Sequence, residues 1–324
     1  MLSIDFRLPP GPETVAQAQL AERLGYNRVW CPEIPAFGHD IWMTLSRIAE
    51  GTERIGLGAA VLVPSFRHPV AQASAIATLE QAAPGRFVAG FGTGFTGRGG
   101  LGQPPLTLAD MRAHITQVRA LLRGEPVQID GALAKMLPFT GWHPAYPIDV
   151  PLLLASQGPR GRALAAEIAD GLISMGTPAA GFDTSLVSIA GTVFEPGEDF
   201  SAQRVRKSLA PLVATAYHGT FMSAPERVAQ LPNGEAWLAS VNTVPEAERH
   251  LSVNQGHNQE ISNGHDALID VSLAARTTFS GDVDTLRKRL EQLAEGGATG
   301  VILGSSGVDV ERELRAFAEV AGLG

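Results

Sequence analysis

The fold is decided by residues 55–91, which read IGLGAAVLVPSFRHPVAQASAIATLEQAAPGRFVAGF. Residues 55–63 are an apolar run closed by Pro64, and they predict a strand. Residues 70–82 carry the apolar spacing of a helix, and residues 86–91 predict a second strand. Both strands are apolar almost throughout, as strands are when helices cover both faces of their sheet. This order of elements predicts two parallel strands joined by a right-handed crossover.

The same alternation of strands and helices continues on both sides of this unit. Further strands are predicted at Leu2–Phe6, Arg28–Cys31, Pro151–Ala155, Leu172–Met175 and Gly300–Gly304. Further helices are predicted at Glu13–Leu24, Ile41–Ala49, Leu106–Leu122, Arg160–Ala169, Val283–Glu295 and Val310–Ala321. The units number about eight, with one obscure stretch. They predict an α/β fold, a single-domain eight-stranded parallel (β/α) TIM barrel over residues 1–324. The alternative, a doubly wound open sheet, would place GxGxxG after the first strand, and Phe6–Pro10 lacks it.

Two segments depart from this alternation. Residues 124–139 predict a short hairpin over one end of the barrel. Residues 196–280 are richer in polar residues, and we interpret them as an insertion before the last units that forms a lid or an oligomer surface. Residues 254–259, NQGHNQ, predict a solvent-facing loop within it. Short helices are predicted in the insertion at Ser201–Ala214, Glu246–Leu251 and Asp266–Ala275.

Composition narrows the classes of function. The net charge of −8 argues against a nucleic-acid partner, because such proteins need a basic face. No apolar run reaches the length of a membrane span. The first residues, MLSIDFRLPPGP, lack the basic and apolar regions of a secretory signal. The single Cys31 excludes an intramolecular disulfide framework. We therefore expect a soluble, cytoplasmic enzyme that acts on a small organic molecule and binds neither nucleic acid nor membrane.

Two common classes of barrel enzyme lack their necessary residues. A metal-dependent hydrolase would need a His-x-His pair, and none of the eight histidines forms one, so no metal site is expected. A Schiff-base aldolase needs a lysine on a barrel strand. Lys135, Lys207 and Lys288 all lie outside the predicted strands.

Three segments, in this order and spacing, resemble the bacterial luciferase-like superfamily of flavin- and F420-dependent oxidoreductases. They are IGLGAAVLVPSFRHP (55–69), PGRFVAGFGTG (84–94) and ASQGPR (155–160), the last followed by IADGLI at 168–173. The resemblance is nearest to the F420-dependent branch that contains methylene-tetrahydromethanopterin reductase. It implies a TIM barrel and a bound cofactor, either the deazaflavin F420 or FMN.

The resemblance also implies which loops hold the cofactor. A non-prolyl cis peptide between Ala60 and Val61 would lie behind the ring. Glycines after a strand let the backbone approach a ligand, and a helix start offers N–H groups to a phosphate. The ordinary alternative is that these are tight turns without a ligand. The implied cofactor residues are Ala60, Val61, Gly92, Thr93, Gly94, Ser156, Gln157, Gly158, Pro159, Arg160, Ser174, Met175, Gly176 and Thr177.

Three side chains are candidates for catalysis. In the family, the loop after the second strand supplies a polar group near the reactive ring carbon, so Glu33 or His39 would donate a proton to the substrate. Asp5, placed at the end of the first strand, is the third candidate. The alternatives are solvated loop residues, with Asp40 as a helix N-cap, and an acid that caps the barrel. We expect Arg67 and His68 to be structural.

The implied activity is hydride transfer between the cofactor ring and an organic substrate. With FMN, a monooxygenase that uses oxygen is the alternative, and a non-catalytic flavin-binding relative is the second. Phe95 stands where sugar-phosphate enzymes of the family carry an acid, which argues against that substrate class. Phe91, Phe95 and Trp142 suggest a hydrophobic substrate, and we expect a homodimer.

Overall fold

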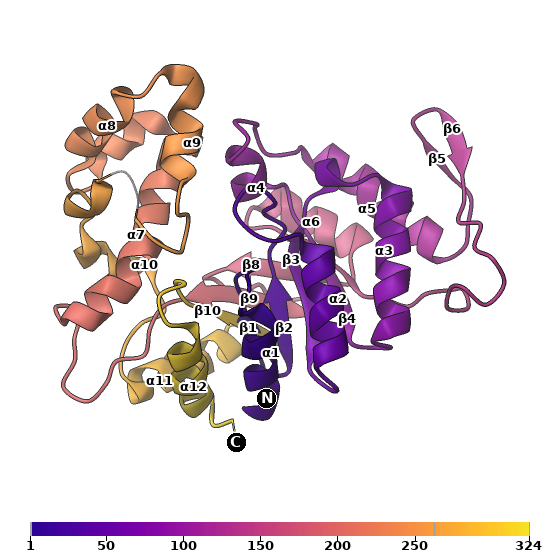
Figure 1. Cartoon of the computed structure of the whole chain (residues 1–324), viewed down its shortest axis with the longest axis horizontal. Coiled ribbons are helices and arrows are strands. Elements are labelled where there is room, and N and C mark those ends of the chain that lie inside the picture. The colour runs from indigo at the N-terminus through magenta and orange to yellow at the C-terminus, as the bar shows by residue number, and fades with distance from the viewer. Residues whose placement is uncertain (1, 262–263, 324) are drawn as a thin grey trace.

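Eight parallel strands close into a barrel in the computed structural model, which describes residues 2–261 and 264–323 (Figure 1). The strand order around the barrel is β1-β10-β9-β8-β7-β4-β3-β2. Their bounds are β1 (Ser3–Arg7), β2 (Arg28–Cys31), β3 (Gly56–Leu62), β4 (Phe87–Phe91), β7 (Leu152–Ala155), β8 (Gly171–Met175), β9 (Ser185–Ala190) and β10 (Gly300–Gly304). The predicted TIM barrel is confirmed.

Side chains from several strands fill the barrel interior, as is usual in this fold. This interior cluster consists of Trp30, Val88, Leu153, Ile173, Leu186 and Ile302. Because side chains alternate along a strand, residues two positions apart from these also face inward. The register pairs Trp30 with both Arg7 and Gly58, so the inward side chain of Arg7 lies at the carboxyl end of β1.

Helices form a ring around the strands. They are α1 (Thr14–Arg23), α2 (Ile41–Gly51), α3 (Pro69–Ala82), α5 (Leu108–Leu122), α6 (Pro159–Ile168), α11 (Val283–Glu295) and α12 (Val310–Ala321), with the short α4 (Phe95–Gly99) above β4. Asp40 caps α2 by accepting hydrogen bonds from the amides of Trp42 and Met43. His68 caps α3 through the amide of Val70. These contacts agree with the structural roles expected for Asp40 and His68.

The barrel strand that the sequence did not reveal is β9. Residues 176–184 join β8 to β9 directly, without a helix between them, so the alternation that identifies the other units is broken there. The second departure, the hairpin, consists of β5 (Val127–Ile129) and β6 (Ala132–Ala134) in antiparallel pairing, as predicted. Figure 1 shows this hairpin on the far side of the molecule from the insertion.

The insertion between β9 and α11 is helical. It contains α7 (Gln203–Ser223), α8 (Gly234–Asn242), α9 (Arg249–Asn254) and α10 (Ala274–Thr277), with 3-10 turns at Pro225–Gln230, Glu246–Glu248, His265–Ala267 and Val271–Leu273. These elements enclose a second apolar cluster around Tyr217 and Trp237. The predicted helix Ser201–Ala214 continues to Ser223, and α8 was not predicted. That the whole chain is a single domain stays a prediction.

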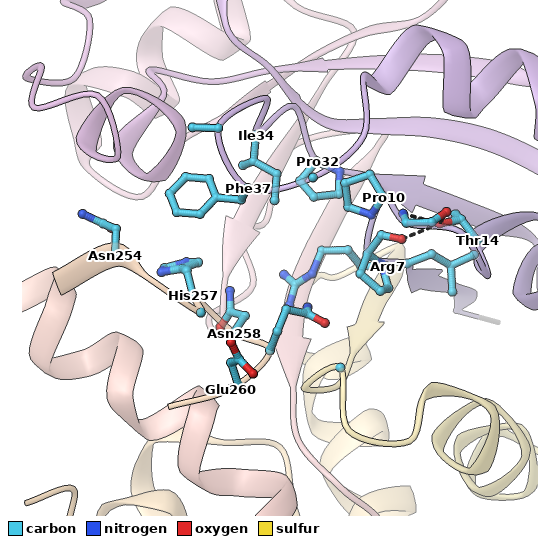
Figure 2. Close-up of a pocket in the computed structure, with 18 of the residues that line it drawn as sticks. Arg7, Pro10, Thr14, Pro32, Ile34, Phe37, Asn254, His257, Asn258 and Glu260 are labelled. Carbon is cyan, nitrogen blue, oxygen red and sulfur yellow. Dashed lines mark hydrogen bonds between the residues drawn. The ribbon is translucent and has the colours of Figure 1, made fainter. Parts of the chain in front are cut away.

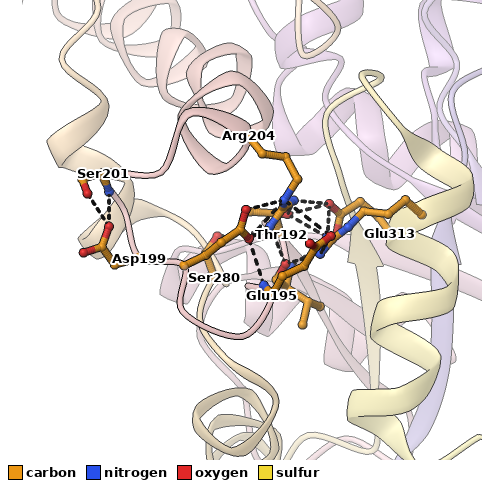
Figure 3. Close-up of polar contacts among 10 residues, drawn as sticks. Thr192, Glu195, Asp199, Ser201, Arg204, Ser280 and Glu313 are labelled. Atoms are coloured by element: carbon orange, nitrogen blue, oxygen red, sulfur yellow. Dashed lines mark hydrogen bonds and ion pairs between the residues drawn. The ribbon is translucent and has the colours of Figure 1, made fainter.

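A polar cluster ties the insertion to the barrel (Figure 3). Arg204 of α7 pairs with Glu198 and lies 3.7 Å from Oε1 of Glu313 on α12. Oε1 of Glu313, which is buried, also accepts hydrogen bonds from the hydroxyl of Thr192 (2.5 Å) and from Arg312 (2.7 Å). Arg204 of α7 and Arg312 of α12 also donate to the same residues, Thr192 and Val193, so this ion pair and these charge-assisted hydrogen bonds connect α7 to α12 through the segment after β9.

Among the described residues, no helix is both long enough and apolar enough to span a membrane.

Candidate functional site

The predicted cofactor residues gather on one arc of the barrel mouth. They lie in the last residues of β3, β4, β7 and β8 or directly after them, and these strands are consecutive neighbours in the barrel. All eight strands are parallel, so their carboxyl ends meet at the same end of the barrel, where barrel enzymes carry their active sites. The linear order of the motifs thus becomes a continuous surface, which the sequence alone could not establish.

The end of β3 has the backbone that the family resemblance implied. The peptide bond between Ala60 and Val61 is cis, and the pairing register with β4 shifts between Ala59 and Leu62. β4 then approaches this irregular segment closely. A Cβ built on Gly92 would lie 2.4 Å from Cγ2 of Val61, so only glycine fits without movement. Gly94 has a φ of +79°, which also favours glycine.

The start of α6 presents free backbone donors. Gly158 is the N-cap residue, and no side chain caps this helix. The first amides of a helix have no partner within it, and Pro159 has no amide hydrogen, so the next amides are those available to a ligand. Gln157, Gly158 and Arg160 are exposed, and a Cβ built on Gly158 would have no atom within 4 Å. Ser156 lies against Gly161 in the first turn.

The end of β8 fits the prediction less well. Ser174 is 1% exposed, and its hydroxyl donates to the carbonyl of Leu186 (3.3 Å), because its side chain lies on the opposite face of β8 from the inward Ile173. Ser174 therefore does not face the mouth, contrary to its predicted role. The amides of Gly176 and Thr177 already donate to Ser188 and Met175. The side chains of Met175 and Thr177 remain exposed at this end.

Glu33 is held beside the irregular segment of β3. Its Oε2 accepts a hydrogen bond of 2.6 Å from the amide of Val63, and its own amide lies 3.3 Å from the carbonyl of Val61. The side chain is 7% exposed. Burial raises the pKa of the Glu33 carboxyl to about 7, although the Val63 hydrogen bond opposes the shift. A carboxyl with this pKa can both give and take a proton near neutral pH.

The other two catalytic candidates lie elsewhere. His39 is an exposed loop residue whose amide donates to the carbonyl of Pro10. Asp5 is fully buried in the middle of β1, where it accepts hydrogen bonds from Trp30 Nε1 (2.8 Å) and Ser3 Oγ (2.8 Å). The sequence suggested that Asp5 lies at the end of the strand. It does not, because β1 continues for two more residues. Arg7 takes that position instead.

A pocket of about 840 Å³ opens on the other arc of the mouth, beside the ends of β1, β2 and β10 (Figure 2). The segment that follows α9 in the insertion forms its opposite wall. None of the described residues that the sequence assigned to the cofactor lines this pocket. Its lining includes Arg7, Leu8, Pro10, Pro32, Ile34, Phe37, Asn254, His257, Asn258 and Glu260.

The prediction that residues 254–259 form a solvent-facing loop is only partly confirmed, because Gln255 and Gln259 are exposed and the other four residues are not. Asn254 is 2% exposed, and His257 is half-buried with its ring 5.9 Å from that of Phe37. The segment closes the pocket because it packs back against the loop after β2. Its polar composition resembled that of a surface loop, and no local pattern revealed the packing. The sequence analysis missed this pocket; a signal that could have revealed it is Arg7, a charged residue directly after the predicted apolar strand Leu2–Phe6.

Comparisons with known proteins identify relatives of this chain in sequence and in fold. The sequence profile described as luciferase-like monooxygenase matches residues 7–300. The chain is 27% identical over 297 residues to the 5,10-methylenetetrahydromethanopterin reductase of Methanolobus tindarius, a match that covers 89% of this chain and 88% of the reductase.

Solved structures share the fold. The coenzyme F420 dependent tetrahydromethanopterin reductase from Methanopyrus kandleri superposes with a TM-score of 0.69 at 18% identity, over 98% of this chain and 97% of the reductase. Monooxygenase RslO1 from Streptomyces bottropensis superposes with a TM-score of 0.62 at 19% identity, over 98% of each chain.

Proposed function

The chain belongs to the luciferase-like monooxygenase family, and from this premise we propose that it is an oxidoreductase that transfers hydride between a bound F420 or FMN and a small organic substrate. The observation that carries the proposal is the continuous arc formed by the ends of β3, β4, β7 and β8. The similarity to a methylenetetrahydromethanopterin reductase over most of both chains, together with the fold shared with a reductase described as coenzyme F420 dependent, favours F420.

The residues present fit such a cofactor. The close approach of Gly92 to Val61 makes a smooth wall of backbone and small side chains, against which a flat ring can lie. The uncapped start of α6 suits a phosphate of the cofactor, since the helix dipole and free amides both favour an anion there. Ser156, Gln157, Gly158 and Arg160 would hold that phosphate. When bound, the cofactor supplies a ring that can exchange a hydride.

Glu33 would manage the proton that accompanies hydride transfer. Its Oε2 is occupied by the Val63 amide, which leaves Oε1 to carry the proton. Because the pKa is about 7, a substantial fraction of Glu33 is protonated at neutral pH, as a general acid requires. Ala60, Val61 and Thr93, on the same arc, would position the ring relative to this carboxyl.

Titration of the purified protein with F420 and, separately, with FMN tests the proposal. Quenching of F420 fluorescence on binding would support the F420 enzyme, whereas tight FMN binding with oxygen consumption would support the monooxygenase that the family profile describes. A protein that binds neither cofactor would refute the proposal. A protein that binds a cofactor but catalyses no hydride transfer or oxygen consumption would be the non-catalytic relative. The predicted homodimer is tested in the same samples by sedimentation.

A further inference from the structure

Arg7 places an unneutralised cation at the mouth of the barrel. Its guanidinium lies over Gly304, where a built Cβ would be 2.8 Å from Nη2, and it makes a hydrogen bond of 3.4 Å to Ser188 Oγ. In the described part of the chain, no carboxylate lies within ion-pair distance of Arg7. Arg7 is half-buried, and a charge that is partly removed from water loses hydration that an acidic partner would normally compensate. Burial accordingly lowers the pKa of Arg7.

The wall that faces Arg7 carries further unused hydrogen-bonding atoms. Oδ1 of the buried Asn254 and Nδ1 of His257 have no partner among the residues that the structure describes. The amide nitrogen of Asn254 is used, since it donates to the carbonyl of His250 (2.8 Å). Burial, followed by the charge of Arg7, lowers the pKa of His257 to about 4, so the ring is neutral. Figure 2 shows Arg7 on one side of the pocket and His257 and Asn258 on the other.

The remaining surroundings limit the charge of a ligand. Two exposed acids, Glu13 and Glu260, also line the pocket. They would repel a doubly charged phosphate more strongly than a single negative charge. Leu8, Pro10, Pro32, Ile34 and Phe37 give the pocket an apolar wall beside Arg7. A guanidinium matches the two oxygens of a carboxylate with parallel hydrogen bonds.

We propose that this pocket recognises an organic acid, with Arg7 binding the carboxylate, Asn254 and His257 contacting a neighbouring polar group, and the apolar wall receiving the carbon skeleton. This inference rests on the proposed function, because it names the substrate class of that enzyme. Arg7 here is a specificity-determining residue, on the opposite arc of the mouth from the proposed cofactor residues.

The test compares carboxylates with their primary amides on the unmodified protein, with and without bound cofactor. Benzoate, phenylacetate and hexanoate are titrated against benzamide, phenylacetamide and hexanamide by calorimetry. We expect each carboxylate to bind at least tenfold more tightly than its amide, because a charged hydrogen-bond partner is lost in the amide. Equal affinities within the three pairs would overturn the inference, and this result needs no variant.

The variant Arg7→Met tests whether Arg7 is the residue that causes any preference for carboxylates over amides. We expect this variant to lose the preference for carboxylates and to unfold at the same or a higher denaturant concentration, since it removes an unpaired charge. Arg123→Gln, which changes an exposed arginine on the barrel exterior, is the matched control and should keep the preference. A preference that survives in Arg7→Met, or that is lost equally in Arg123→Gln, would overturn the assignment.

F420 itself carries acidic groups, so its affinity separates the two sources of carboxylate. We expect Arg7→Met to bind F420 within twofold of the unmodified protein. A large loss of F420 affinity would overturn the substrate assignment and place the cofactor on Arg7. Failure of the protein to bind either F420 or FMN would instead refute the proposed function, while the comparison of acids and amides still decides the pocket's specificity.

Discussion

Replacing Gly158 with aspartate separates stability from cofactor binding at the start of α6. The backbone of Gly158 is extended, with φ −83° and ψ 160°, and no atom lies within 4 Å of a built Cβ. An aspartate therefore fits without strain. Because aspartate is a preferred N-cap residue and glycine is only slightly worse, the free energy of unfolding should stay unchanged or rise by a few tenths of a kcal/mol.

The same aspartate would place a negative charge where the cofactor phosphate is proposed to bind. Two unit charges about 4 Å apart repel by about 1 kcal/mol in water and about 4 kcal/mol at an effective dielectric of about 20. Since 1.4 kcal/mol corresponds to about tenfold in affinity, the cofactor should bind roughly fivefold to a thousandfold more weakly. Gly158 is exposed, so high salt should reduce the loss by screening.

Fluorescence titration with the cofactor, at low and high salt, measures this effect. Gly158→Asn is the matched control, because asparagine has the same shape and also caps helices but carries no charge. If Gly158→Asp binds the cofactor as tightly as Gly158→Asn, the start of α6 does not hold an anion. If Gly158→Asp unfolds at clearly lower denaturant concentration, the reasoning about the cap is wrong.

Three further predictions concern stability. The pKa of Glu33 lies at about 7 instead of its ordinary 4.5, so the folded protein holds this proton more tightly than the unfolded chain. The stability that comes from this proton is complete below pH 4.5 and is lost as pH rises through about 7. In urea unfolding, the free energy of unfolding of Glu33→Gln should therefore rise by up to about 3 kcal/mol relative to that of the unmodified protein between pH 4.5 and 8. Parallel pH profiles of the two proteins would contradict this. Gly92→Ala should cost about 1–3 kcal/mol because its Cβ would overlap Val61, whereas Gly11→Ala, with open space around it, should not; equal melting temperatures would refute the overlap. Tyr26→Phe should cost about 0.5–1.5 kcal/mol, since the buried Tyr26 hydroxyl donates to the carbonyl of Leu314 in α12 (2.7 Å), and an unchanged denaturation midpoint would refute a net contribution from this hydrogen bond.

Most barrel elements were predictable because their signals are local. The helices Val283–Glu295 and Val310–Ala321 and the strand Gly300–Gly304 have the predicted bounds, since each is amphipathic or apolar over its own length. β9 was missed because no helix separates it from β8. α8 was missed because its apolar residues pack on α7 and on the turn before it, so only the folded insertion defines its buried face.

The candidate site likewise contains some residues that the sequence can reveal and others that only the folded structure can place. Residues that act through their own backbone, such as Gly92, Gly94 and Gly158, carry a signature that sequence can reveal, because glycine is required or favoured by local geometry. Glu33 was visible as a polar residue after a strand, but its raised pKa comes from burial beside the end of β3. Asp5 and Ser174 were misplaced because strand bounds and pleat decide which way a side chain points.

The sequence by itself determined the parallel barrel, because its patterns repeat within single strand–helix units, and the resemblance of three motifs to a known family indicated the family and predicted the loops that would hold a cofactor. Only the tertiary structure decided that these loops form one arc, that Arg7 ends β1 without an ion-pair partner among the described residues, and that residues 254–259 close a pocket opposite to it. The physical reason is that charge, burial and hydrogen-bond satisfaction depend on groups from both ends of the chain. Residues 7 and 257 are far apart in sequence, and only the packing of the insertion against the barrel brings them to one cavity.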